Sequence, residues 1–206
     1  MENLWDSRFK AKEYVYGTLP NVFFKTTIDK YNLKGKILLP AEGEGRNAVY
    51  AAQKGMDVYA FDTSIEGKNK AMKLAERNHV SINYEVGDFF ELELINERFD
   101  VVALIYAHFS PELLPIYHKK LAELLKPNGI IIIEGFSKNH IENQKTNPTA
   151  GGPKNLEMLF SIDTMKRDFP NFEIIKLEET EEYLEEGQFH KGKAKLIQFI
   201  GRKRVQ

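Results

Sequence analysis

The chain contains no cysteine among its 206 residues. This absence excludes disulfides, thiolate catalysis and every zinc or iron–sulfur site that needs cysteine ligands. An excess of one charge is also lacking, because 29 Lys and Arg face 30 Asp and Glu, so we expect no general attraction to nucleic acid or to an anionic membrane. No HxH or HxxxH pair occurs among the five histidines, which argues against a metal site.

Long hydrophobic runs are missing as well. The longest, such as residues 101–106 and 130–133, are far shorter than the roughly 20 residues that span a bilayer. The N-terminus lacks the basic start and apolar stretch of a signal peptide. We therefore expect a cytoplasmic protein without a membrane partner, and a single compact domain, since domains usually contain about 100–200 residues.

What the sequence does contain is an alternation of short β-branched runs with helical stretches, at an ordinary hydrophobic content of 42%. Such alternation predicts parallel βαβ units and a sheet with helices on both faces. The expected strands are residues 36–40, 58–61, 82–86, 99–105 and 130–134, and the expected helices are residues 47–54, 64–77 and 111–125.

The last third of the chain follows a different pattern. Residues 138–155 are rich in Asn, Gly, Pro and Thr and predict a loop, followed by a short helix over 161–168. Residues 172–177 and 194–200 resemble strands with no long helix between them, so they are expected to pair antiparallel. The acidic run 178–186 between them is typical of a solvated face. The expected sheet is therefore mostly parallel, with one reversed strand near its C-terminal end.

A glycine-containing segment follows the first expected strand. Gly43-x-Gly45-x-x-Ala48 matches the pattern G-x-G-x-x-G/A, in which glycines allow a tight turn and a close approach of a ligand to the backbone. Asp62 ends the next strand 19 residues after Gly43, a spacing at which a carboxylate accepts the hydroxyls of a ribose. The two features predict a nucleotide-containing cofactor. The alternatives are an ordinary turn and an Asp62 that caps the following helix.

Two further strand ends carry side chains suited to a ligand. Asp88 and Phe89 follow the third strand, where a carboxylate can bond an exocyclic amine and a ring can pack on a purine, unless they form a simple capped turn. Ile105, Tyr106 and His108 come at the carboxyl end of the fourth strand, the edge where open α/β sheets bind ligands. There Tyr106 would wall the substrate site and His108 would be a general base, or else a half-buried residue at a helix entry.

Two late loops are the last candidates. Gly151-Gly152-Pro153-Lys154 and the segment 186–192 place glycines around Glu186 and His190. Glycines that flank a carboxylate and an imidazole favour a site over two plain turns. His190 is thus a second candidate for a general base.

Together these residues resemble class I S-adenosylmethionine-dependent methyltransferases, and within them the subgroup of tellurite-resistance-type and, more distantly, thiopurine methyltransferases. The likeness covers nearly the whole chain. It is carried by Trp5-Asp6-x-Arg8-Phe9, Glu13-Tyr14-Val15-Tyr16-Gly17-Thr18-x-Pro20-Asn21, Pro40-Ala41-Glu42-Gly43-Glu44-Gly45-Arg46-Asn47, Phe61-Asp62-x-Ser64, Gly87-Asp88, Leu125-Lys126-Pro127-x-Gly129, Glu134-Gly135-Phe136, Gly151-Gly152-Pro153 and Glu186-Gly187-x-x-His190-x-Gly192.

The resemblance implies a Rossmann-like, seven-stranded fold in one domain, 1–206, with an N-terminal lid over 1–33 and an α/β core over 34–206. It implies S-adenosyl-L-methionine as cofactor, S-adenosyl-L-homocysteine as product, and a monomer or homodimer acting on a small molecule such as a thiol or a metalloid oxyanion. The residues that it places at the cofactor are Ala41, Glu42, Gly43, Gly45, Asp62, Thr63, Asp88, Phe89, Ile105, Tyr106 and Tyr16.

Within that set the resemblance gives three side chains distinct roles. Asp62 would bind the ribose hydroxyls, Asp88 the adenine amino group, and Tyr106 would lie near the transferred methyl group. The backbone of residues 42–45 would hold the methionyl part of the cofactor. The aromatic side chains of the lid would close over the cofactor or the substrate, and they are Trp5, Phe9, Tyr14 and Tyr16.

Two positions depart from the family pattern. Leu39 stands where many class I enzymes have an acidic residue, and Ala41 where they often have glycine. The cofactor amino group would then be held by Glu42 or by an N-terminal side chain. The same glycine motif and Asp62 also fit an NAD-dependent oxidoreductase, and the Leu39 departure leaves open a cofactor-binding protein without catalysis.

Methyl transfer from a sulfonium places few demands on the protein beyond alignment and exclusion of water. A soft anionic acceptor needs no strong base, whereas a hydroxyl or amine acceptor needs one. The candidate catalytic residues are therefore His108, His190 and Tyr106.

Overall fold

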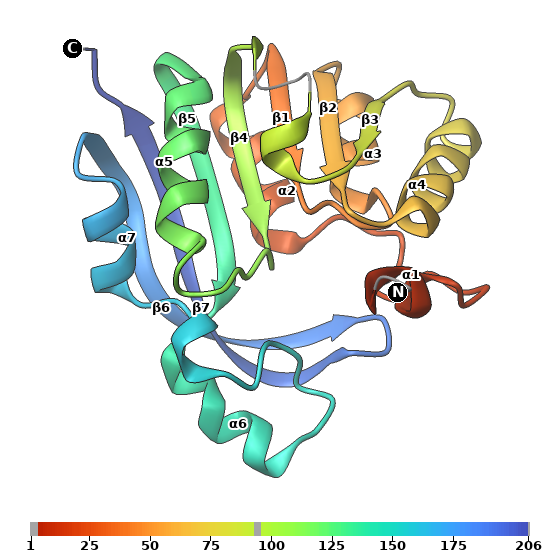
Figure 1. Ribbon diagram of the computed structural model, residues 1–206, viewed down its shortest axis with the longest axis vertical. Helices are drawn as coiled ribbons and strands as arrows, with labels where there is room; N and C mark the ends of the chain where they lie inside the picture. The colour runs from red at the N-terminus through yellow and green to blue at the C-terminus, as the bar shows by residue number, and fades with distance from the viewer. Residues whose placement is uncertain (1–3, 93–95, 206) are drawn as a thin grey trace.

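One mixed sheet of seven strands forms the centre of the computed structural model, which describes residues 4–92 and 96–205. The strand order is β3-β2-β1-β4-β5-β7-β6 (Figure 1). Strands β1 to β5 are parallel, and β7 runs antiparallel to both of its neighbours. The strands are β1 (Lys36–Pro40), β2 (Asp57–Asp62), β3 (Asn83–Val86), β4 (Phe99–Ile105), β5 (Leu125–Phe136), β6 (Phe172–Glu186) and β7 (His190–Lys203).

Helices cover both faces of this sheet, as the alternating pattern predicts (Figure 1). Those named in the figure are α1 (Leu4–Phe9), α2 (Val22–Tyr31), α3 (Arg46–Gln53), α4 (Ile65–Arg77), α5 (Leu114–Leu124), α6 (Ile141–Thr146) and α7 (Ile162–Asp168). Short 3-10 turns are η1 (Phe89–Glu91), η3 (Lys138–His140) and η4 (Leu156–Met158).

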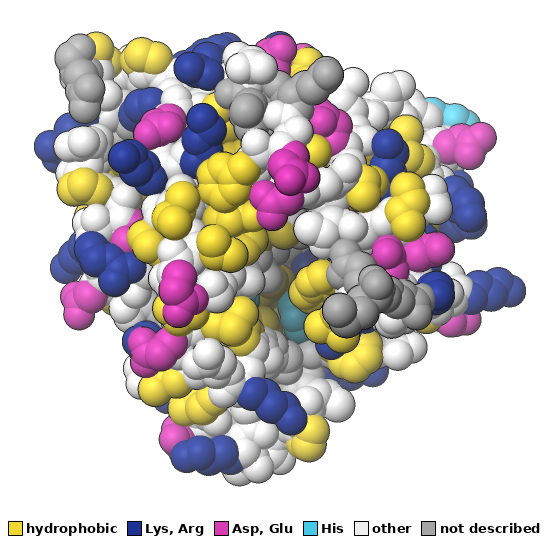
Figure 2. All heavy atoms as spheres, viewed as in Figure 1, with side chains coloured by type: hydrophobic (Ala, Val, Ile, Leu, Met, Phe, Trp, Pro, Cys, Tyr) yellow, Lys and Arg dark blue, Asp and Glu magenta, His cyan; other side chains and the backbone are white. Residues whose placement is uncertain are grey.

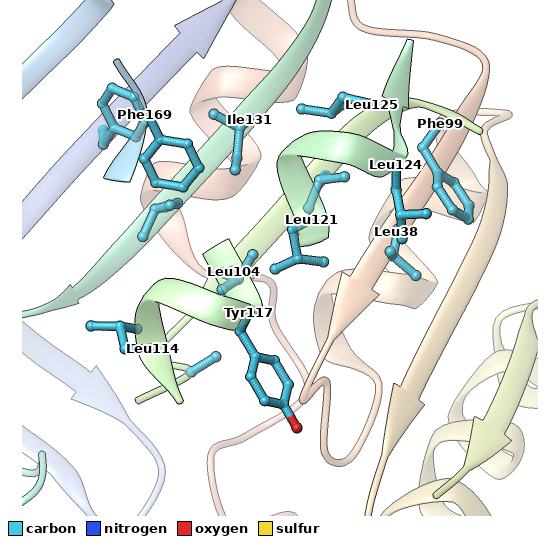
Figure 3. Packing of buried hydrophobic residues seen from close by; sticks show 14 of the residues in the cluster. Leu38, Phe99, Leu104, Leu114, Tyr117, Leu121, Leu124, Leu125, Ile131 and Phe169 are labelled. Atoms are coloured by element: carbon cyan, nitrogen blue, oxygen red, sulfur yellow. The ribbon is translucent and has the colours of Figure 1, made fainter. Parts of the chain in front are cut away.

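The core consists of a layer on each face of the sheet. On one face α5 packs against β1, β4 and β5, where Leu121 meets Leu38 and Leu104, all fully buried (Figure 3). On the other face α2, α3 and α4 bury Phe24 and Ala71 against strand residues such as Ile37. Burial of apolar surface on both sides is what the continuous β-branched strands require.

The sheet order reverses between β1 and β4, so the helices that follow these two strands lie on opposite faces. In an open α/β sheet this switch point opens a crevice outside the carboxyl ends of the strands. The long β6–β7 hairpin extends past β5 and curves beneath those ends toward α1 (Figure 1). At its tip the backbone N–H of Gln188 donates to the carbonyl of Val15 over 2.9 Å.

Several expected boundaries are wrong. The strand expected at 130–134 runs from Leu125 to Phe136, and the helix expected from 111 begins at Leu114. The segment expected as a loop, 138–155, contains η3 and α6. The strands expected at 172–177 and 194–200 form a hairpin of 15 and 14 residues, because backbone pairing continues through the acidic run.

The predicted fold class is confirmed: a mostly parallel seven-stranded sheet with a reversed strand near the C-terminus. Within residues 4–92 and 96–205, no helix is both long and apolar enough to cross a membrane.

Candidate active site

The two strands at the switch point both end in backbone conformations that are rare for side-chain-bearing residues. Ala41 follows β1 with φ +51°, and Tyr106 follows β4 with φ +56°. The left-handed region costs a non-glycine residue roughly 1–2 kcal/mol, and such strain gathers at functional sites. The backbone N–H of Tyr106 donates to the Glu134 carbonyl over 2.7 Å, which holds the turn in place. Ile105, the last residue of β4, is half-buried beside it.

Gly43 and Asp62 are joined across the ends of β1 and β2. The N–H of Gly43 donates to Oδ2 of Asp62 over 3.0 Å, and the N–H of Ser64 donates to Oδ1 over 3.0 Å. Tyr84 fixes the same turn by donating its hydroxyl hydrogen to the Gly43 carbonyl over 2.7 Å. Burial raises the pKa of Asp62, although the hydrogen bonds from Ser64 and Gly43 oppose this shift. Each carboxylate oxygen keeps capacity for another donor.

Gly45 packs closely against α4. A Cβ at this position would lie 2.5 Å from the Cβ of Ala71 on α4, and its φ is +85°. The glycine therefore lets the start of α3 lie against α4, which is one of the roles of glycine in the dinucleotide pattern.

Glu42 caps a helix. Its Oε1 accepts the N–H groups of Asn47 and Ala48, each over 2.8 Å, at the start of α3. Burial raises the pKa of Glu42 to about 7, although the hydrogen bond from Ala48 opposes this shift. Leu39, where an acid is common, is fully buried in the core.

In the turn after β3, the ring of Phe90 faces the surface, whereas the ring of Phe89 is buried. Phe89 is 1% exposed and stacks on Phe61 with ring centroids 5.2 Å apart, whereas Phe90 is 41% exposed. Asp88 caps the η1 turn through the N–H of Phe90. Thr63 is exposed at the end of β2.

The N-terminal segment up to Val15 packs on the glycine turn at residues 43–45. Glu44 accepts the N–H of Val15 over 2.7 Å and forms an ion pair of 2.7 Å with Lys70. On α1 the ring of Phe9 covers Gly43, whose Cβ would lie 3.1 Å from Cζ of that ring. Tyr16 accepts a hydrogen bond of 3.0 Å from Arg8.

His190 lies at the centre of an aromatic cluster. Its ring centroid is 4.5 Å from that of Tyr106, 4.6 Å from Tyr16 and 5.2 Å from Phe136. Its Nδ1 lies 3.2 Å from Oε2 of Glu186. The two late loops therefore meet at the site, because Gly151 packs against the His190 ring. Figure 2 shows a hollow on this side of the molecule, with a histidine side chain inside it and hydrophobic side chains around it.

His108 has both ring nitrogens in hydrogen bonds. Nδ1 lies 2.8 Å from the Met158 carbonyl, and Nε2 accepts the N–H of Phe136 over 3.1 Å. This pattern is that of a neutral ring that donates through Nδ1. Burial lowers the pKa of His108 to about 4, although the Met158 carbonyl opposes the shift.

A buried polar cluster that motif reasoning did not assign to the site joins Asn21, Glu134 and Gln198. Asn21 Nδ2 donates to one Glu134 oxygen and Gln198 Nε2 to the other, each over 2.6 Å. Burial raises the pKa of Glu134 to about 7, and these two amides oppose the shift. Nδ2 of Asn21 also lies 3.3 Å from Glu186, which links this cluster to His190. Asn21 and Glu134 stand within motifs of the family resemblance, but no local pattern showed that the three residues meet, since they come from segments far apart in the chain.

Beside these groups lies a cavity of about 840 Å³, between the start of α2 and the β6–β7 hairpin. The side chains that line it include Tyr16, Arg46, Glu134 and Glu186. Because Tyr16 also contacts His190, the cavity adjoins the aromatic cluster. Within the described part of the chain, no group of three or more His, Asp or Glu side chains is arranged to hold a metal ion.

Strand order, reversed strand and switch-point crevice together define a class: the chain has the Rossmann-like fold of class I methyltransferases. Residues 37–129 also match the family described as "Methyltransferase domain". These findings support a methyltransferase that depends on S-adenosylmethionine.

Individual proteins agree with this class. The chain is 33% identical over 159 residues to "Uncharacterized methyltransferase YbaJ" of Bacillus subtilis, covering 75% of this chain and 61% of that protein. The chain thus spans less than two thirds of that relative's length. Relatives matched at 27% and 30% identity are named as a ribosomal protein L11 methyltransferase of Dictyoglomus turgidum and a tRNA (uracil(54)-C(5))-methyltransferase of Pyrococcus furiosus.

Two solved structures show the fold likeness. One is described as "Conversion of a Disulfide Bond into a Thioacetal Group during Echinomycin Biosynthesis", with a TM-score of 0.77 at 19% identity over 98% of this chain and 91% of that one. The other is TehB from Haemophilus influenzae, with a TM-score of 0.70 at 19% identity over 87% of this chain and 61% of that one.

Proposed function

We propose that this chain is an S-adenosylmethionine-dependent methyltransferase of the tellurite-resistance and thiopurine type that acts on a small-molecule acceptor. Its single domain would comprise a lid, 1–33, over an α/β core, 34–206. The observation that carries the proposal is the hydrogen bond between Gly43 and Asp62 at the switch point, flanked by the strained ends of β1 and β4. This is where the fold class binds a nucleotide-containing cofactor.

The residues present fit that cofactor. The N–H groups of Gly43 and Ser64 donate to one Asp62 oxygen each and Thr63 adds a further backbone contact, which leaves acceptor capacity for a ribose hydroxyl. The Tyr106 hydroxyl is buried close to the Glu134 carboxyl group, but the geometry between the two groups is not that of a hydrogen bond. A buried hydroxyl left unpaired costs free energy, so an apposed ligand that bonds it would be favoured. Asp88 and Phe90 would flank the adenine.

The cofactor supplies a methyl group on a positively charged sulfur when bound. The chain's own residues then align the acceptor and exclude water. Tyr16, Tyr106 and His190 would wall the reacting centre, and the segment from α1 to Val15 would close over it. Because Glu42 is used to cap α3, an N-terminal group is the better candidate to hold the cofactor's amino group.

The size of the cavity and the charge of the chain favour a small acceptor over a polymer. The cavity of about 840 Å³ falls within the range of small-ligand pockets. The net charge of −1 offers no general attraction to a nucleic acid. Because two relatives are named as methyltransferases of a ribosomal protein and of tRNA, an experiment has to test which class of acceptor is methylated.

Calorimetry with S-adenosylhomocysteine and with NADH tests the cofactor directly. We expect binding of the former and none of the latter. Incubation with cofactor carrying a tritiated methyl group, and with cell extract fractionated into small molecules, protein and RNA, then tests the acceptor. Label confined to protein or RNA would contradict a small-molecule acceptor, and binding of NADH alone would favour an oxidoreductase.

A further inference from the structure

We propose that Glu186, held by Arg46, positions His190 to take a proton from the methyl acceptor, and that the acceptor is therefore a neutral thiol or phenol and not a preformed oxyanion. This inference rests on the proposed methyltransferase function and names the acceptor class for that same site.

The orientation of His190 follows from one carboxylate oxygen. Oε2 of Glu186 accepts a hydrogen bond of 3.0 Å from Nη2 of Arg46 and lies 3.2 Å from Nδ1 of His190. A carboxylate can only accept, so Nδ1 carries the hydrogen and the lone pair of the neutral ring is on Nε2. Among the described residues, Nε2 of His190 has no hydrogen-bond partner, so this lone pair is available to a ligand.

The ring is also held in its plane. Tyr16 and Tyr106 contact it from two sides at centroid distances of 4.6 and 4.5 Å. Gly151 closes a third side, since a Cβ there would lie only 2.6 Å from Cδ2 of His190. A ring confined in this way presents Nε2 in one direction, which is the requirement for a positioned base.

Burial and the neighbouring charged side chains set the pKa of His190. Burial lowers the pKa of His190, the hydrogen bond and charge of Glu186 on β6 oppose this, and Arg46 on α3 and Arg8 on α1 lower it further. The rings of His108 and His140 face it as well, and each has its own pKa lowered by burial. The imidazole is therefore neutral near pH 7 and able to accept a proton.

The cavity offers no free cation to an oxyanion. Its two basic side chains are both paired: Arg46 with Glu186 at 3.0 Å, and Lys176 with Glu178 at 2.9 Å. Glu134 and Glu186 contribute the acidic side chains nearest the aromatic cluster. An anion such as tellurite or selenite would lie beside these carboxylates, and among the described residues no basic side chain that lines the cavity is free to pair with it, which is unfavourable in a partly buried site.

The acidity of the acceptor group limits which classes of small molecule His190 can deprotonate. A thiol with a pKa of about 8.5 or a phenol of about 10 lies within reach of a neutral imidazole, whereas an aliphatic alcohol is far less acidic. A protonated amine has no lone pair to attack the methyl carbon, and with a pKa of about 10.4 it is less acidic than either acceptor. A neutral thiol or phenol avoids both penalties.

The step balances without any further reactant. A lone pair of the acceptor sulfur or oxygen forms the bond to the methyl carbon, and the electrons of the breaking sulfonium S–C bond stay on that sulfur. The acceptor proton passes to Nε2 of His190, where the Glu186 carboxylate stabilises the imidazolium through Nδ1–H. Release of that proton to solvent restores the neutral ring.

The first test is an NMR titration of the histidine rings with S-adenosylhomocysteine present, in the wild type, Glu186→Gln and Glu181→Gln. Glu181 lies on the same strand with its carboxyl group largely exposed, so it is the matched control. We expect the pKa of His190 to fall by about one unit in Glu186→Gln, since an opposite charge in contact shifts a pKa by this order. It should stay unchanged in Glu181→Gln. An unchanged pKa in both variants would overturn the inference.

The second test is turnover with benzyl mercaptan and 2-naphthol against selenite and tellurite. We expect methylation of the first pair only, a kcat about 100-fold lower in Glu186→Gln with KM little changed, and partial recovery in Glu186→Asp, which keeps the charge. The acidic limb of the pH–rate profile should follow the NMR pKa of His190. Methylation of tellurite that His190→Gln leaves unaffected would refute the inference but leave the proposed function intact. Failure to bind S-adenosylhomocysteine would instead refute the proposed function.

Discussion

The side-chain amide of Asn21 donates a hydrogen bond of 2.6 Å to the carboxylate of Glu134, which lies 113 residues further along the chain. The same side chain caps α2, because its Oδ1 accepts the N–H of Phe24 over 2.8 Å. Asn21 therefore joins the N-terminal segment to the end of β5, next to the cavity and the aromatic cluster. This bond therefore stabilises the buried end of β5 and the N-terminal segment together.

Replacing Asn21 with Ala should destabilise the fold by about 2–4 kcal/mol. About 1 kcal/mol comes from the lost helix cap, and the rest from a buried carboxyl group that loses a donor. Urea unfolding measures the change. Asn155→Ala is the control, since Asn155 caps the exposed η4 turn and should cost well under half as much. Equal losses in the two variants would contradict the role assigned to Asn21.

Glu134 should make stability fall as the pH rises. Its pKa is about 7 in the folded protein against 4.5 ordinarily, so between these values the folded state binds the proton that the unfolded state has released. Folding stability from this group is thus fully present below about pH 4.5 and is lost as the pH rises through 7. The difference between these two pKa values corresponds to a loss of about 3 kcal/mol.

Unfolding by urea at pH 5, 6, 7 and 8 tests this. Glu134→Gln should lose this part of the pH slope, whatever its stability at pH 5, whereas Glu181→Gln should keep it. The difference between variants is the informative quantity, because His108, with a pKa lowered to about 4, contributes a slope of opposite sign. Parallel curves for wild type and Glu134→Gln would show that Glu134 titrates normally.

Asp62→Asn should weaken binding of S-adenosylhomocysteine by about 10- to 100-fold. A hydrogen bond to a charged group contributes roughly 1.5–3 kcal/mol, and each 1.4 kcal/mol is a factor of ten in affinity. Isothermal calorimetry measures the Kd. Asp57→Asn, at the exposed opposite end of the same strand, should bind as the wild type does. A Kd that moves equally in both variants would argue against the ribose role of Asp62.

Tyr106→Phe should leave the free energy of unfolding unchanged within about 0.5 kcal/mol. Its hydroxyl lies near the Glu134 carboxyl group without a hydrogen bond of good geometry, so its removal costs little. Tyr84→Phe removes a hydroxyl that donates to the Gly43 carbonyl and should cost about 1–2 kcal/mol. Denaturant titration compares the two, and a large loss in Tyr106→Phe would reveal a structural bond at that hydroxyl.

Gly45→Ala should destabilise the fold by about 3 kcal/mol. The added Cβ meets Ala71 at 2.5 Å, and φ +85° is strained for alanine. Gly55→Ala provides the control, because φ is similar at +79° but no atom lies within 4 Å of the added Cβ. It should cost only about 1 kcal/mol. Similar losses would mean that backbone strain, and not the contact between α3 and α4, sets the requirement for glycine.

Features encoded over a few residues were predictable. The β-branched runs that became β1 to β4 and the turn Gly43-x-Gly45 depend on local conformation and on burial patterns within one segment. The hairpin was underestimated, because the residues 178–186 are mostly acidic and lack the apolar alternation that marks a strand. Its pairing partner, β7, supplies the backbone hydrogen bonds that composition does not reveal.

The sequence by itself determined the fold class, the order of the strands along the chain and the place of the glycine turn and Asp62, because these follow from periodicity and spacing within short segments. Only the tertiary structure decided which polar groups meet. Asn21 reaches Glu134, and Arg46 reaches Glu186 over 140 residues of chain, solely because the sheet brings their strands and helices together. Burial at those meeting points then sets their pKa values, which no local pattern encodes.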